Sequence, residues 1–157
     1  PEKTDGYEGF IHLMNINGDT EKTELSYIIR DHDREKFEAK KQLFLDTAEK
    51  IKAEYGATAI SVELNDQYYN MGEKITPVIE ILNVAKDVMI ALDIEPLIIP
   101  VRGGTDGSQL SYMGMPTPNV FTGGENYHGK YEFISVNDMA KSTEVVKGII
   151  QSFEQQA

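Results

Sequence analysis

The apolar residues follow two different patterns on either side of residues 65–75, and this change limits the folds open to the chain. Before it, two β-like runs, a helical pattern and a further β-like run follow one another in the order β-β-α-β. After it, wide apolar helical stripes alternate with short runs of the kind that parallel sheets bury. The sequence therefore predicts an α+β region over residues 1–71 and an α/β region over residues 72–157.

The first region is expected to open with an antiparallel hairpin. Residues 10–16 mix apolar and polar side chains, and residues 25–30 are β-branched and aromatic. Between them, Asn17-Gly18-Asp19 favours a turn, because Asn and Gly tolerate positive φ. A third strand is expected over residues 58–64. With one helix, these strands would form half of a sandwich in which a helix packs across an antiparallel sheet.

Helices are predicted from apolar spacing and from the residues that favour helix ends. The first helix follows Asp31 or Asp33 as its cap and ends at Gly56, and a second opens at Thr76-Pro77. Further helices are expected over residues 106–113 and 137–153, and short strands over residues 97–101 and 119–122. Each region has too few strands to bury its apolar faces alone, so each is expected to be incomplete.

The composition narrows the classes of function. Lys and Arg number 15 against 26 Asp and Glu, a net charge of −11, and this argues against a nucleic-acid partner because phosphate binding needs a concentrated basic surface. No apolar run is long enough to cross a membrane, and the first residues lack the apolar core of a leader peptide. The absence of Cys excludes thiolate metal sites and favours a reducing compartment, so a cytoplasmic location is expected.

The segment Arg102-Gly-Gly-Thr-Asp-Gly-Ser108 lies between a predicted strand and a predicted helix. Its glycines would let a ligand approach the backbone, the helix N-terminus would favour an anion, and Arg102 would grip a carboxylate or phosphate. It matches neither the Walker sequence nor the dinucleotide-binding fingerprint, because its glycines are spaced differently. The alternative is a tight turn in which Asp106 caps the helix, and the spacing alone does not decide between the two.

Three further residues are candidates for a functional site. His128 follows a predicted strand in a segment rich in glycine and aromatic residues, where an imidazole could bind a metal, although a lone His is more often structural. Arg30 ends a predicted strand beside Asp31, and an edge arginine paired with neighbouring carboxylates is the stronger interpretation from the residues alone. Asn70 is either a polar contact where the two regions meet or a turn residue.

Longer runs resemble a known family. They are Gly6–Phe10, Tyr27–Asp31, Tyr68–Met71, Arg102–Gly124 and Asn126–Phe133. Together they closely resemble, in the same order, the tripeptide aminopeptidases of the M20 zinc metallopeptidase family. The resemblance implies the later part of a ferredoxin-like lid, or dimerisation, domain over residues 1–71. It also implies the C-terminal part of a zinc-peptidase α/β catalytic domain over residues 72–157.

The resemblance implies roles for individual residues. His128 corresponds to the last zinc ligand of the family, and Arg30 to an arginine of the lid that holds the substrate. Arg102 and Asp106 correspond to the pocket beside two zinc ions, and Asn70 to a polar residue near the lid junction. In the family, zinc activates a water, a glutamate takes its proton, and the N-terminal residue of a tripeptide is released.

Other parts of that family's site are absent from these 157 residues, namely the H-x-D motif, a bridging aspartate and a Glu-Glu pair that includes the general base. The chain is therefore expected to be the C-terminal part of such an enzyme, to be inactive alone, and to have the missing part as its partner. A homodimer through the lid domain is a further expectation. Two alternatives stay open: a non-catalytic module that binds an anion through the turn after Arg102, and a module that pairs through exposed strands.

Overall fold

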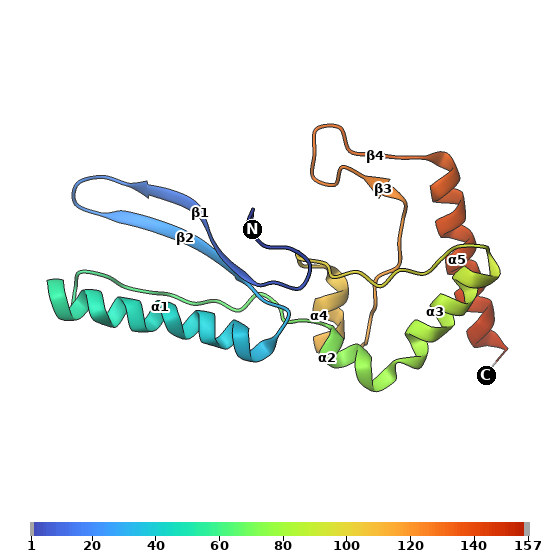
Figure 1. Ribbon diagram of the computed structural model, residues 1–157, viewed down its shortest axis with the longest axis horizontal. Coiled ribbons are helices and arrows are strands. Elements are labelled where there is room, and N and C mark those ends of the chain that lie inside the picture. Colours follow the sequence, from blue (N-terminus) through green and yellow to red (C-terminus); the bar gives the residue numbers. More distant parts are fainter. Residues whose placement is uncertain (1, 156–157) are drawn as a thin grey trace. The chain divides into compact units, whose positions relative to one another are not determined.

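A computed structural model describes residues 2–155, and its elements combine helices with two small antiparallel sheets (Figure 1). The chain divides into two compact units. One runs to Asn70 and includes Ile99–Gly104, and the other comprises Met71–Ile98 and the residues from Thr105 onward. The expected mixture of helix and antiparallel strand is confirmed. The assignment of the two regions to a lid domain and a catalytic domain stays a prediction.

The first unit is built on a hairpin of β1 (Phe10–Gly18) and β2 (Thr23–Arg30), as the sequence predicts. Asp19 closes its turn, because Oδ1 accepts hydrogen bonds from the backbone N–H groups of Glu21 and Lys22 at 2.8 and 3.0 Å. The register of the two strands shifts once within β1, at a bulge, and bulges of this kind bend a strand and increase its twist.

Helix α1 (Arg34–Tyr55) packs against this hairpin (Figure 1). Asp33 caps its first turn by accepting a backbone hydrogen bond at 2.9 Å, and Gly56 ends the helix with a φ of 104°. The rings of Tyr27 in β2 and Phe44 in α1 meet edge to face with their centroids 5.0 Å apart. The predicted helix and both of its predicted ends are confirmed.

Residues 58–64 form no strand, so the expected order β-β-α-β is wrong in its last element. The segment instead runs back along α1 as an uncoiled chain (Figure 1). A strand exists only where its backbone N–H and C=O groups pair with a neighbour, and the sheet described for the first unit holds β1 and β2 alone. The strands expected over residues 97–101 and 119–122 are absent for the same reason, since no described segment pairs with them.

The second unit is mainly helical. Its elements are α2 (Gly72–Ile75), a 3₁₀ turn (Thr76–Val78), α3 (Glu80–Ala91), α4 (Asp106–Tyr112), β3 (Gly124–Glu125), β4 (Phe133–Ile134) and α5 (Val136–Glu154). Helices α3 and α5 approach closely, because a Cβ at Gly148 of α5 would lie 2.6 Å from Val88 Cγ1 of α3. Ala85 and Val145 are buried in these two helices.

The second helical segment begins earlier than the sequence predicts. Helical turns start at Gly72, and Thr76 lies inside them with its hydroxyl donating to the Gly72 carbonyl at 2.8 Å. The prediction of Thr76 as a helix cap is therefore wrong. Pro77 has no N–H to donate, which fits its place in the 3₁₀ turn between α2 and α3.

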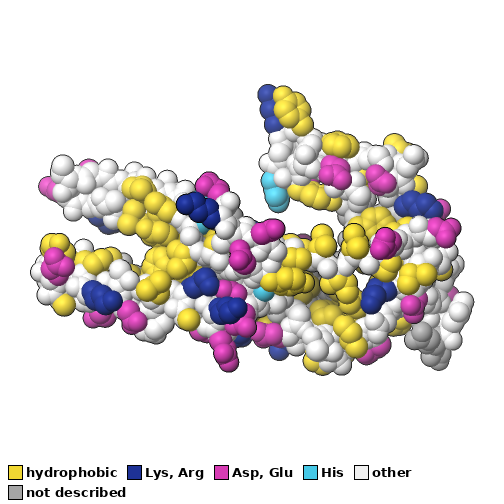
Figure 2. Space-filling model, viewed as in Figure 1, with side chains coloured by type: hydrophobic (Ala, Val, Ile, Leu, Met, Phe, Trp, Pro, Cys, Tyr) yellow, Lys and Arg dark blue, Asp and Glu magenta, His cyan; other side chains and the backbone are white. Residues whose placement is uncertain are grey.

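Both units leave apolar faces uncovered. The buried apolar side chains among residues 2–155 are Ala48, Ile75, Ala85 and Val145. Leu97, Ile98 and Ile99, expected in a buried strand, are 76, 62 and 71% exposed, and apolar side chains reach the surface over both units (Figure 2). None of the described helices is long and apolar enough to cross a membrane.

Candidate functional site

Arg30 ends β2, and its guanidinium is held from two sides. Nη2 donates to Gln67 Oε1 at 3.0 Å, and Nη1 donates to the carbonyl of Ile29 at 3.2 Å. Its Cζ lies 4.8 Å from the centre of the Tyr68 ring, within the range of a cation–π contact. The expectation that Arg30 pairs with neighbouring carboxylates is wrong, because Asp31 is bound by another cation.

Asp31 forms a buried ion pair next to Arg30. Its side chain is 2% exposed, and Oδ2 accepts a hydrogen bond from Lys40 Nζ at 2.5 Å while Oδ1 accepts one from the backbone of Asp33 at 3.0 Å. Burial by itself raises the pKa of Asp31, but these two hydrogen bonds and the charge of Lys40 outweigh it and hold the pKa below its ordinary value. Gly9 leaves room for the pair, since a Cβ there would lie 2.0 Å from Oδ2. The end of β2 is thus fixed to α1.

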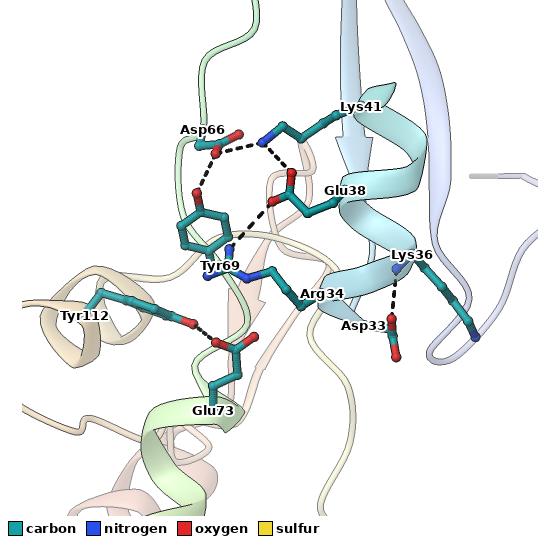
Figure 3. A network of polar contacts seen from close by, with 9 residues as sticks. All are labelled: Asp33, Arg34, Lys36, Glu38, Lys41, Asp66, Tyr69, Glu73 and Tyr112. Atoms are coloured by element: carbon teal, nitrogen blue, oxygen red, sulfur yellow. Dashed lines mark hydrogen bonds and ion pairs between the residues drawn. The ribbon is translucent and has the colours of Figure 1, made fainter. Parts of the chain in front are cut away.

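A polar network holds the segment before Asn70 against α1 (Figure 3). Tyr69 Oη and Lys41 Nζ both donate to Asp66 Oδ2, at 2.5 and 3.0 Å. The bond from Tyr69, and then that from Lys41, lower the pKa of Asp66, and the same bonds raise the pKa values of Tyr69 and Lys41. Arg34 adds to the network by stacking its guanidinium on the Tyr69 ring, with Cζ 3.5 Å from the ring centre.

Tyr69→Phe is expected to lower the free energy of unfolding by about 1 kcal/mol at pH 7, because it removes one hydrogen bond to a charged acceptor. The lowered pKa of Asp66 means that this bond stabilises the fold above about pH 4 and is lost as the pH falls. The raised pKa of Tyr69 means that it stabilises the fold below about pH 10 and is lost as the pH rises. The measurement is thermal unfolding of both proteins at pH 7, below about pH 4 and above about pH 10. A difference between them that is as large at the two extremes as at pH 7 would contradict the assignment.

Asn70 makes a contact of its own. Its Nδ2 donates to the carbonyl of His32 at 3.0 Å, and this bond links the segment that ends at Asn70 to the loop before α1. Of the two interpretations of the sequence, the structure thus supports a polar contact. The role of Asn70 toward a substrate stays a prediction.

Arg102 is engaged inside the first unit. Nη1 donates to the carbonyl of Thr4 at 2.7 Å, and Nη2 donates to the Thr4 hydroxyl and to the carbonyl of Glu8, the latter at 3.1 Å. Its Cζ lies 5.0 Å from the centre of the Phe10 ring. These contacts fix the start of the described chain and leave fewer N–H groups for an anion. The role of Arg102 in a substrate pocket stays a prediction.

Packing accounts for two of the three glycines in the segment 102–108. A Cβ at Gly104 would lie 2.3 Å from Tyr68 Cε1, so the absence of a side chain is what lets the Tyr68 ring lie there. A Cβ at Gly107 would lie 2.4 Å from the carbonyl oxygen of Thr117. The glycines therefore serve close contacts within the protein, whatever else this turn binds.

Asp106 does not cap α4. Thr105 occupies the cap position with an extended backbone, and Asp106 is the first helical residue, with its side chain exposed. A carboxylate in the first turn is favourable for the helix dipole. Arg102 and Asp106 belong to different units, and their expected place in one pocket stays a prediction.

His128 lies in the loop between β3 and β4, with a φ of 62°, a region that residues other than glycine rarely adopt. Its backbone N–H donates to Glu132 Oε2 at 3.2 Å, and Gly129 donates to the carbonyl of Asn126 at 2.9 Å. The imidazole is exposed and makes no hydrogen bond or ion pair with the rest of residues 2–155. The loop thus holds a strained backbone while it leaves the ring available, and strain of this kind is concentrated at functional sites.

The described residues do not form a complete metal site. Zinc in proteins is held by three or four side chains. Between residues 2 and 155, no group of three His, Asp or Glu side chains could hold a metal ion. Zinc therefore does not fit these residues alone, and His128 can be one ligand only.

The partners of Arg30 and Asp31 were not found from the sequence. Gln67 and Tyr68 lie 37 and 38 residues from Arg30 along the chain, and no local pattern connects them. The only signal in the sequence was the glycine at position 104, because a glycine can mark a close approach of another group. The structure shows that the group is the Tyr68 ring and that Gly104 has no positive φ.

The chain is similar along its whole length to known peptidases. Those relatives are named peptidase T, and they are 62% identical in Lysinibacillus sphaericus, 59% in Macrococcus caseolyticus and 59% in Bacillus subtilis, each over all 157 residues. The chain spans only 38 to 39% of the length of these relatives. No family model matches it. The chain is thus a homologue of a segment of peptidase T, which confirms the resemblance as far as that name. The M20 assignment, zinc and tripeptide substrates stay predictions.

Proposed function

We propose that the chain is the C-terminal part of an aminopeptidase like peptidase T, a cytoplasmic hydrolase that removes the N-terminal residue from tripeptides. What supports this is the identity of 59 to 62% to proteins of that name over every residue of the chain. Because the chain spans 38% of the first of these relatives, the proposed activity belongs to a longer protein. The 157 residues alone are expected to be inactive.

In this proposal, His128 is the contribution of the chain to a zinc site completed by residues outside it. The exposed imidazole on a backbone with positive φ supports this role, because the ring makes no hydrogen bond or ion pair with the rest of residues 2–155. Zinc, when bound, supplies a water of lowered pKa as the nucleophile.

Arg30 is the residue proposed to hold the C-terminal carboxylate of the tripeptide. A guanidinium offers five N–H donors in a planar fork, and two of them are used here, by Ile29 and Gln67. The remaining N–H groups can donate two parallel hydrogen bonds to a carboxylate. Arg102, Asp106 and Asn70 are proposed to line the same substrate pocket.

A second copy of the protein is proposed to bind through the lid domain. Within the described chain, β1 pairs only with β2, so the outer edge of each strand has unpaired backbone groups. Met14 and Ile16 of β1 are 61 and 59% exposed. A strand edge with apolar side chains of this kind is suited to pairing with another chain.

The test is the release of the N-terminal residue from a tripeptide by the full-length protein that contains this chain, with zinc added. We expect turnover by the full-length protein and none by the 157 residues alone. A tripeptide amide should be a poorer substrate than the free acid, because it lacks the carboxylate that Arg30 is proposed to bind. Release of no N-terminal residue by the full-length protein would overturn the proposal, and turnover by the short chain would overturn the part that concerns its inactivity.

A further inference from the structure

The surroundings of Arg30 include a tyrosine whose hydroxyl has no partner. The Tyr68 ring lies under the guanidinium, with Arg30 Cζ 4.8 Å from the ring centre. The Tyr68 hydroxyl is buried and makes no hydrogen bond with any described residue. A buried hydroxyl without a partner carries a cost in free energy, so the contact that keeps Tyr68 in place is made by its ring.

The position of that ring also depends on Gly104. A Cβ at this position would lie 2.3 Å from Cε1, 2.5 Å from Cζ and 2.9 Å from the hydroxyl oxygen of Tyr68. Separations below 3.0 Å are not adopted by real Cβ atoms, so any side chain at 104 would displace the ring. Gly104, Tyr68 and Arg30 therefore form a continuous series of contacts within the first unit.

Together these contacts restrict the orientation of the guanidinium. An arginine side chain loses conformational entropy when its orientation is fixed. If it is mobile in the free protein, this loss of entropy weakens the binding of the substrate. Here the Gln67 amide binds one edge of the guanidinium, and the Tyr68 ring supports it through a cation–π contact. The donors not used by Ile29 and Gln67 are thereby oriented before a ligand arrives.

We propose that Tyr68, held in place by Gly104, is a positioning residue for substrate binding that orients Arg30 toward the C-terminal carboxylate of the peptide. This inference rests on the proposed function and assigns Tyr68 and Gly104 a part in it. It also gives the glycine-rich turn a role that requires no contact between the turn and the substrate.

The main test compares Tyr68→Leu with Tyr68→Phe in the full-length protein. Leucine removes the aromatic ring, so KM for a free-acid tripeptide should rise about five-fold while kcat stays within about two-fold. Phenylalanine retains the ring, so its KM should equal that of the wild type. KM for the corresponding tripeptide amide should not change in either variant, because Arg30 has no carboxylate to bind there.

The matched control is Tyr69→Phe. It removes a hydroxyl from the next residue, where the hydroxyl does have a partner in Asp66. This variant should unfold at a lower temperature than the wild type but keep its KM for the free acid. If Tyr69→Phe raised KM as much as Tyr68→Leu, general loosening of the segment would explain both, and the proposal would be overturned.

Gly104→Ala tests the position of the Tyr68 ring through a second residue. It should raise KM for the free acid by a factor similar to that of Tyr68→Leu, and it should add nothing to Arg30→Ala, because both act through one guanidinium. Additive effects would overturn the proposal, as would an increase in KM for Tyr68→Phe equal to that for Tyr68→Leu. If the wild-type protein has no peptidase activity, the proposed function is contradicted. If the wild-type protein is active and Tyr68→Leu has the same KM, only the inference about Tyr68 is contradicted.

Discussion

His128→Ala is expected to abolish the zinc-dependent peptidase activity of the full-length protein while its stability hardly changes. Loss of a residue that only supports a metal ligand costs about 10- to 100-fold in affinity or activity, so loss of a ligand should cost more than about 100-fold. The side chain is exposed and has no partner among residues 2–155, so the free energy of unfolding should change by less than about 0.5 kcal/mol. Activity, bound zinc per chain and thermal unfolding are the measurements.

Two further variants make this test specific. His128→Asn preserves a residue that tolerates the φ of 62°, so a loss of zinc in this variant reflects the imidazole and not the backbone. His32→Ala is the control, because the His32 ring packs edge to face on Tyr7 with centroids 5.1 Å apart. That variant should lose some stability and keep its zinc. Near-normal activity in His128→Ala would show that this histidine is not a ligand.

Lys40→Met is expected to produce the largest loss of stability, about 3 kcal/mol at pH 7. It leaves the Asp31 carboxylate, 2% exposed, without its cation, and removing one partner of a buried ion pair costs about 3 to 5 kcal/mol. The control is Lys36→Met, which removes an exposed charge that acts on Asp31 without a hydrogen bond and should cost less than about 0.5 kcal/mol. Chemical denaturation of the three full-length proteins measures the difference.

The pH dependence of this loss has a definite sign. In the wild type, folding lowers the pKa of Asp31. The ion pair therefore stabilises the fold fully above the pKa of an unfolded aspartate, about 4, and this stabilisation is lost as the pH falls through the pKa of Asp31 in the folded protein. In Lys40→Met, burial should instead raise the pKa of Asp31 in the folded protein, so this variant is least stable at the higher pH values at which the Asp31 carboxylate is charged. The difference between the two proteins should therefore shrink below about pH 4. A difference that stayed constant down to about pH 3 would contradict the assignment.

The sequence predicted well those parts of the fold that depend on neighbouring residues. The turn closed by Asp19 and the helix between Asp33 and Gly56 are determined within a few residues, by side-chain caps and by a glycine with positive φ. The expected third strand, residues 58–64, failed because strand formation depends on a partner that the pattern of one segment does not specify.

For the candidate site, the sequence likewise predicted the local features and missed the distant contacts. Residue type and local context were sufficient to select Arg30 and His128, and the resemblance to a family gave them roles. The partners of Arg30 come from residues far along the chain, and the sequence wrongly favoured its neighbour Asp31, which binds Lys40.

The uncovered run from Leu97 to Val101 has a consequence for the lifetime of the chain in a cell. The side chains of Leu97, Ile98, Ile99 and Val101 are 51 to 76% exposed. Chaperones and proteases act on exposed apolar segments of this kind before they act on a finished fold. Pro100 removes one backbone donor, which limits stacking of this segment against copies of itself. The rate at which the chain is degraded in a cell should therefore depend on its assembly. Degradation should be slow where another segment covers residues 97–101 and fast where none does.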